Sequence, residues 1–194
     1  SAYAAAKNGA KVILAEDKPR FGGSLLTSDV NIGNQTGAEW TEKIISELKS
    51  MSNVIVKNRS QVFGYYDHNM LVMTERLSDH LPKTEEHTPK QKLWYIRAKE
   101  VVISSGSIER PLVFGNNDTP GVMLSSAAKE YMKVYGVLVG RKPIIFTNND
   151  TGYETALEFK KNGIDPLVLD TRKNPKSDII NEAKSLNIEI KFSY

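Results

Sequence analysis

Short apolar runs alternate with polar, turn-forming stretches along this chain, a pattern typical of interleaved strands and helices. Residues 2–7 are rich in alanine and are followed by Asn8-Gly9, which predicts a helix and its end. Residues 11–16 surround a continuous apolar run, which predicts a parallel strand buried on both faces. A helix that leads into such a strand is the second half of a βαβ unit. We therefore expect the first strand and its glycine-rich turn to precede Ser1 in a longer parent chain.

The middle of the chain predicts one more helix and several strands. Residues 36–51 form an amphipathic helix whose apolar face carries Trp40, Ile44, Ile45 and Leu48. The expected strands are 54–56, the hairpin pair 61–66 and 70–74, 93–98, and a buried parallel strand over 100–105 that ends at Gly106. Residues 78–92 contain prolines and many charges, so we expect an exposed loop there.

The last third of the chain repeats the α/β alternation. The expected helices are 125–135, 153–161 and 177–186, and the expected strands are 143–147, 166–170 and 188–192. The predicted fold class is α/β: a Rossmann-like parallel sheet with flanking helices, an inserted antiparallel β-hairpin or meander, and a second βαβ unit. We expect residues 1–124 to form a partial dinucleotide-binding domain with its β insertion around 61–98. Residues 125–194 would form a second, partial nucleotide-domain-like βαβ segment.

Composition excludes several classes of function. The 194 residues are 40% hydrophobic and 25% charged, enough for one domain or a piece of a larger α/β protein. Lys and Arg number 26 against 23 Asp and Glu, a net charge of +3 that does not predict a nucleic-acid partner. The absence of cysteine excludes disulfides, thiolate metal sites and a redox-active dithiol. The apolar runs are far shorter than the about 20 residues that span a bilayer. With no signal peptide visible, we expect a cytoplasmic chain with no membrane partner.

The most informative candidate site follows the first predicted strand. Glu16 stands at the strand's end, where an acidic residue in a dinucleotide-binding unit accepts hydrogen bonds from the adenosine ribose. Asp17 and Lys18 follow it. The alternative is a solvated acid with no ligand. The glycines of Gly22-Gly23 let a backbone approach an anion, and the Ser24 hydroxyl adds a donor; the alternative for them is a tight turn.

Two other places carry weaker signals. Ser105-Gly106 ends a predicted strand with small residues, which would let a dinucleotide or a crossing loop pass close to the backbone; a simple turn explains them equally well. Residues 147–152 follow a strand of the second unit, but they offer one glycine and place Asp150 where a phosphate would sit. We therefore predict a structural role for that turn. A histidine and glutamate cluster at 80–87 has no usual metal-ligand spacing and predicts exposed loop.

Three blocks, residues 16–25, 105–124 and 146–150, resemble the alpha subunit of heterotetrameric sarcosine oxidase, in the same order. The resemblance implies a fold like that of flavoprotein reductases with two dinucleotide domains. It also implies that this subunit holds NAD, with Glu16, Asp17, Lys18 and Ser24 in the contacting loop and the Val62 backbone near the adenine. The glycine-rich pyrophosphate turn of the family would fall just before Ser1.

The same resemblance implies an oxidoreductase that demethylates sarcosine to glycine, with oxygen as electron acceptor and tetrahydrofolate taking the one-carbon unit. FMN would lie at the interface with the beta subunit, which would carry FAD, and the partners would be the beta and other subunits of the oxidase. We expect no catalytic residue in this chain. Two alternatives stay open: an FAD- and NAD(P)H-dependent flavoprotein reductase or related amine or opine dehydrogenase subunit, and a non-catalytic scaffold for subunit assembly.

Overall fold

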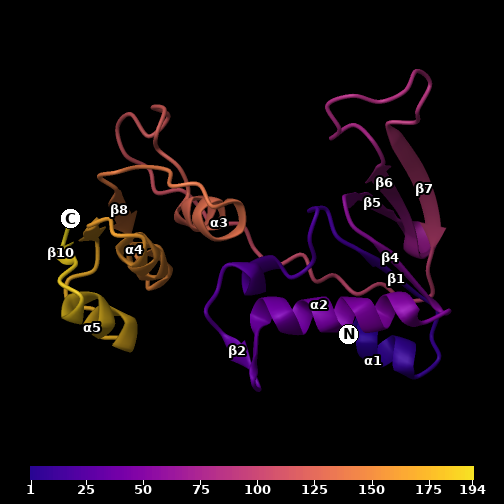
Figure 1. Cartoon of the computed structure of the whole chain (residues 1–194), viewed down its shortest axis with the longest axis horizontal. Helices are drawn as coiled ribbons and strands as arrows, with labels where there is room; N and C mark the ends of the chain where they lie inside the picture. Colours follow the sequence, from indigo (N-terminus) through magenta and orange to yellow (C-terminus); the bar gives the residue numbers. More distant parts are fainter. The chain divides into compact units, whose positions relative to one another are not determined.

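The computed structural model describes residues 1–194 and divides into two compact units, Ser1–Ser105 and Gly106–Tyr194 (Figure 1). The sequence placed the boundary after residue 124. The observed division comes earlier because residues before α3 (Ser125–Tyr135) already pack on the second unit. The carboxylate of Glu109 accepts a hydrogen bond from the Ser126 amide at 2.7 Å, and the Phe114 ring meets the Phe146 ring edge-on at 5.8 Å.

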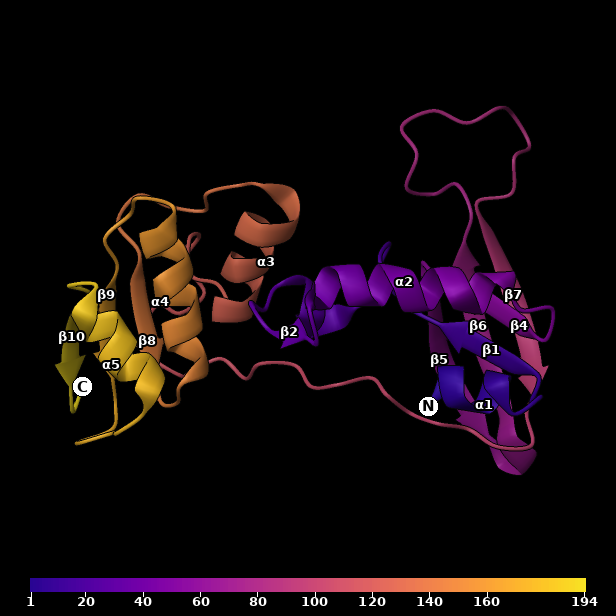
Figure 2. The same ribbon diagram turned by 60° about the horizontal axis from the view of Figure 1, so that its bottom comes forward.

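The first unit contains the parallel strand pair that the sequence predicts. The strands are β1 (Val12–Ala15) and β4 (Val54–Lys57), paired from Val12 with Val54 to Ala15 with Lys57. Helix α1 (Ala2–Lys7) packs on β1 and helix α2 (Gly37–Ser50) on β4 (Figure 2). A short 3-10 helix, η1 (Gly23–Leu26), and the two-residue strands β2 (Asn31–Ile32) and β3 (Gln35–Thr36) lead into α2. Thr36 caps α2 in a reciprocal capping box with Glu39.

The predicted insertion is an antiparallel meander. Its order is β5-β6-β7, built from β5 (Ser60–Tyr66), β6 (Met70–Arg76) and β7 (Gln91–Arg97), with η2 (Asp67–Asn69) in the first turn. His68 and Asn69 take left-handed conformations, with φ of 59° and 52°, which close the hairpin. One face of the sheet is buried at Met73, which has no exposed surface. The predicted hairpin and meander are confirmed.

The buried strand predicted over residues 100–105 is wrong. That stretch forms no strand, and Val102 and Ile103 are 68% and 72% exposed. A strand exists only with a hydrogen-bonding neighbour, and β1 pairs with β4 alone. The same two-stranded sheet leaves Ile13 and Ile55 41% and 44% exposed, so the expectation that β1 is buried on both faces is also wrong.

In the second unit a three-stranded parallel sheet, order β10-β9-β8, supports the predicted helices. Its elements after α3 are β8 (Ile144–Thr147), α4 (Thr151–Lys161), β9 (Leu167–Asp170), α5 (Asp178–Ser185) and β10 (Glu189–Phe192). Figure 2 shows α4 and α5 side by side against the sheet, and α3 packs on α4. The core centres on Tyr153, Ala156, Phe159, Val168 and Ile180. Every strand and helix predicted for this unit is present.

Candidate nucleotide site

The loop after β1 holds Glu16, Asp17, Lys18 and Gly22, and Gly23 and Ser24 begin η1 directly after it. Glu16 directly follows β1, at the carboxyl end of the parallel pair. Its amide donates to the Lys57 carbonyl at 2.9 Å, and its carbonyl accepts from the Ser60 amide at 2.8 Å. The backbone of Glu16 is therefore fixed between the end of β4 and the start of β5. This is the edge where ligands bind in open α/β sheets.

The carboxylate of Glu16 lies in a setting that disfavours its charge. Partial burial raises its pKa, and a hydrogen bond with the neighbouring Asp17 raises it further. The Lys18 amide donates to Glu16 Oε1 at 3.1 Å and opposes the shift. A partly desolvated carboxylate with two acceptor oxygens gains from new hydroxyl donors, because each donor stabilises the charged form.

Long-range hydrogen bonds hold the loop in place. The Asp17 carbonyl accepts a hydrogen bond from the Arg76 guanidinium at 2.7 Å. The Pro19 carbonyl accepts one from the Asn58 side-chain amide, also at 2.7 Å. The Lys18 carbonyl accepts from the Arg59 amide at 3.0 Å. Sequence reasoning missed Asn58 and Arg76, because these donors are 39 and 59 residues away from their acceptors and no local pattern marks them.

The two glycines of the loop have different surroundings. Gly22 has a φ of 128°, and an added Cβ there would lie 3.0 Å from the Leu26 side chain, so this glycine permits a tight turn packed against η1. Gly23 has a φ of 51°, and an added Cβ would meet no atom within 4 Å. Ser24 follows it with an exposed side chain. Gly23 and Ser24, at the start of η1, are therefore open to a ligand, while Gly22 serves the turn.

The other predicted site residues are less closely joined to this loop. Val62 lies on β5, two positions after Ser60, which is bonded to Glu16, and its side chain is 42% exposed. Ser105 and Gly106 end no strand; they lie on the exposed stretch between β7 and α3, and no hydrogen bond connects them to Glu16. Six of the nine predicted residues thus lie in the loop after β1 and the first turn of η1, and Val62 lies on β5.

Other features of the surface lie away from this loop. The outer face of the meander has an apolar hollow of about 450 Å³, lined by Phe63, Tyr66, Met70, Val72, Leu93 and Tyr95. The structure brings no three His, Asp or Glu side chains together in a way that could hold a metal ion. None of its helices has the length and apolar character needed to cross a membrane.

Comparison with solved structures defines the class of fold. L-proline dehydrogenase from P. horikoshii superimposes with a TM-score of 0.68 at 24% identity, over 91% of this chain and 34% of that chain. The HOCl-induced flavoprotein disulfide reductase from Escherichia coli superimposes at 0.61 and 16%, over 99% of this chain and 46% of that one. The chain therefore has the fold that these two oxidoreductases share.

Among proteins of known name, the sequence is similar to the alpha subunit of sarcosine oxidase. It is 40% identical to that subunit from Rhizobium meliloti (strain 1021) over 95% of this chain and 19% of the relative. The subunit from Corynebacterium sp. (strain U-96) is 34% identical over 90% of this chain and 18% of its own length. The chain thus spans about a fifth of these relatives. No family model matches it. The resemblance read from the sequence is confirmed.

Proposed function

We propose that this chain is the NAD-binding part of the alpha subunit of a sarcosine oxidase-like flavoenzyme. One observation carries the proposal: a partly buried carboxylate, Glu16, stands at the carboxyl end of the first parallel strand, followed by a turn with open backbone at Gly23. The similarity to sarcosine oxidase alpha subunits over nearly the whole chain supports it.

The residues of the loop suit the adenosine half of NAD. The Glu16 carboxylate would accept hydrogen bonds from the ribose hydroxyls. The Asp17 charge beside it would repel a phosphate on the ribose, which favours NAD over NADP. The Gly23 amide and the Ser24 hydroxyl would donate to a phosphate, with Lys18 as a nearby positive charge. NAD bound there would be held as a ligand and would not react.

The remaining assignments follow from the resemblance. The Val62 backbone would lie against the adenine. The whole enzyme would oxidatively demethylate sarcosine to glycine, with oxygen as acceptor and tetrahydrofolate taking the one-carbon unit. It would do so in the cytoplasm, with FMN and FAD in the full complex and with beta and other subunits as partners.

The test is NAD binding by the assembled oxidase purified from its source, compared with two variants. Glu16→Gln should weaken NAD about 10-fold or more, because a hydrogen bond to a charged group contributes about 1.5–3 kcal/mol. The matched control is Glu86→Gln, since the Glu86 side chain is 90% exposed on the loop before β7; it should leave binding unchanged. Equal NAD content in all three proteins would refute the role of Glu16.

The same preparation separates the alternatives. Turnover of NADPH by the purified protein would favour a flavoprotein reductase. Assembly of the partner subunits with no bound nucleotide would favour a scaffold. Oxidation of another N-methyl amine or an opine in preference to sarcosine would favour a related dehydrogenase.

A further inference from the structure

The second unit has the layout of a dinucleotide-binding βαβ unit, with β8, α4 and β9 in that order. In such units the first strand leads into Gly-x-Gly-x-x-Gly, and the same spacing here carries Thr147, Asn149 and Gly152. The third glycine allows close packing of helix on strand, and Gly152 does so: an added Cβ would lie 2.7 Å from the Thr147 side chain. The first two positions carry side chains instead.

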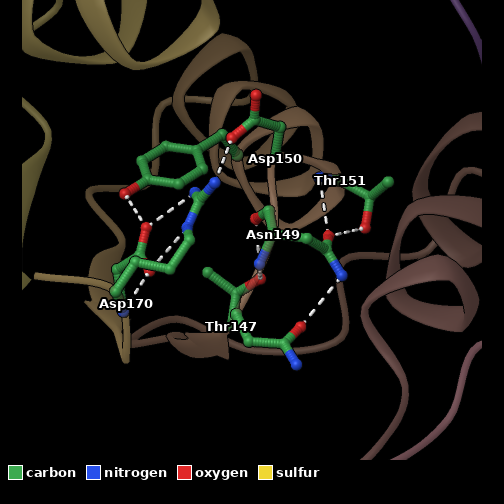
Figure 3. A network of polar contacts seen from close by, with 8 residues as sticks. Thr147, Asn149, Asp150, Thr151 and Asp170 are labelled. Atoms are coloured by element: carbon green, nitrogen blue, oxygen red, sulfur yellow. Dashed lines mark hydrogen bonds and ion pairs between the residues drawn. The ribbon is translucent and has the colours of Figure 1, made fainter. Parts of the chain in front are cut away.

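One of those side chains stands at the motif position where the backbone would approach the pyrophosphate. The second glycine of the motif lets the backbone approach the pyrophosphate at the start of the helix. Asn149 stands at that position, and its Oδ1 accepts from the amide of Thr151 at 3.0 Å and from its hydroxyl at 2.6 Å. The Thr147 hydroxyl binds the backbone of Asn149 at 2.9 and 3.2 Å and holds the residue in this position (Figure 3).

The acid at the ribose-binding position is bonded by Arg172 of the same chain. Asp170 is the last residue of β9, where the ribose-binding acid stands in a dinucleotide unit. It has no exposed surface. Its Oδ1 accepts from the Arg172 amide at 2.9 Å and from Nε at 3.0 Å, and its Oδ2 accepts from Arg172 Nη2 at 2.8 Å and the Tyr153 hydroxyl at 2.7 Å. The guanidinium thus donates the pair of bonds that two ribose hydroxyls would donate.

A third contact links these two positions. The other guanidinium nitrogen of Arg172 lies 2.9 Å from Asp150, the residue between Asn149 and Thr151. The Arg172 guanidinium therefore contacts both Asp150 and Asp170, whose side chains are labelled in Figure 3. Both carboxylates that face the carboxyl edge of β8 and β9 are therefore neutralised by one arginine of the same chain.

We infer that the second βαβ unit is closed to dinucleotides, because Asn149 and Arg172 occupy the positions of the pyrophosphate and the ribose. The unit keeps the fold of a nucleotide domain, and its own side chains replace the ligand. This inference is independent of the proposed role of Glu16. It also separates the chain from reductases that need a nicotinamide cofactor in a second domain.

The test is amide NMR of the ¹⁵N-labelled chain, titrated separately with NADH and with ADP-ribose. At about 1 mM ligand, a site with a dissociation constant of about 1 mM would be half filled. The amides of Asn149, Thr151 and Arg172 should not shift. A saturable shift at any of them would overturn the inference. Shifts or their absence at residues 16–24 bear only on the proposed function, so the two failures are distinguishable.

A second measurement on the ligand-free chain tests the replacement itself. The Arg172 Nε proton donates to a buried carboxylate, so it should exchange with water more slowly than the Nε proton of Arg141, an exposed arginine of the same unit. Equal exchange of the two protons would show that Arg172 does not occupy the ribose position and would overturn the inference.

Discussion

Removing the guanidinium of Arg172 should destabilise the second unit by about 2–4 kcal/mol. Breaking a buried ion pair by deleting one partner costs about 3–5 kcal/mol, because the other charge is left buried without compensation. Asp170 is fully buried and would lose two of its hydrogen bonds in Arg172→Ala, keeping those from the Arg172 backbone amide and Tyr153. The Arg172 side chain is 31% exposed, so in the variant water can reach Asp170 and replace part of the lost hydrogen bonding. The expected cost is therefore below the full range for a buried pair.

The assay is urea unfolding followed by circular dichroism on the wild-type chain and matched variants. The control is Lys160→Ala, which removes the partner of Asp165, a side chain that is 83% exposed. An exposed pair contributes only about 0–1 kcal/mol. The double variant Arg172→Ala with Asp170→Asn should recover part of the loss, since the uncompensated charge is gone. If Arg172→Ala costs no more than Lys160→Ala, the argument from burial is refuted.

Three further predictions concern the stability of the fold and can be checked by urea or thermal unfolding. Burial alone would raise the pKa of Asp170, but the hydrogen bonds from Arg172 outweigh it and hold the pKa below the ordinary value of an aspartate. The second unit should therefore keep this stabilisation above the unfolded-state pKa and lose it as the pH falls through the folded-state pKa, which urea midpoints from about pH 5 to about pH 2 would show. Thr36→Ala removes the cap of α2 and should cost about 1 kcal/mol of unfolding free energy; an unchanged midpoint would contradict the capping box. Gly152→Ala places a methyl group 2.7 Å from Thr147 and should cost about 1–3 kcal/mol, seen as a lower melting temperature. A neutral result would mean that α4 is not packed closely on β8.

Local sequence patterns were sufficient to predict most elements of the fold. The helix over Gly37–Ser50, with its cap at Thr36, follows from helical spacing and capping chemistry, both of which act within a few residues. The strands of the second unit follow from short apolar runs between turns. The position of Glu16 at the end of β1 follows from the same reasoning, because a strand end is visible in the sequence.

The candidate site required more than local pattern. The loop around Glu16 is held by donors from Asn58 and Arg76, which only the folded chain brings near. In the second unit, Thr147, Asn149 and Gly152 match the spacing of a glycine motif, and that signal was available in the sequence. That Arg172 turns back onto Asp170 was not available, because a carboxylate two residues before an arginine is common on exposed surfaces.

Residues 100–105 show where prediction from local sequence pattern stops and tertiary structure decides. Their apolar run has the composition of a buried strand, yet Val102 and Ile103 are mostly exposed. Whether a segment favours a helix or a strand depends on the spacing of its apolar side chains, and this spacing can be read from a short stretch of sequence. Burial and sheet membership depend on a neighbouring strand that supplies hydrogen bonds, and such neighbours come from distant parts of the chain. The same reason explains why most element types could be predicted from the residues alone, whereas the partners of Glu16 and Asp170 were decided by tertiary structure.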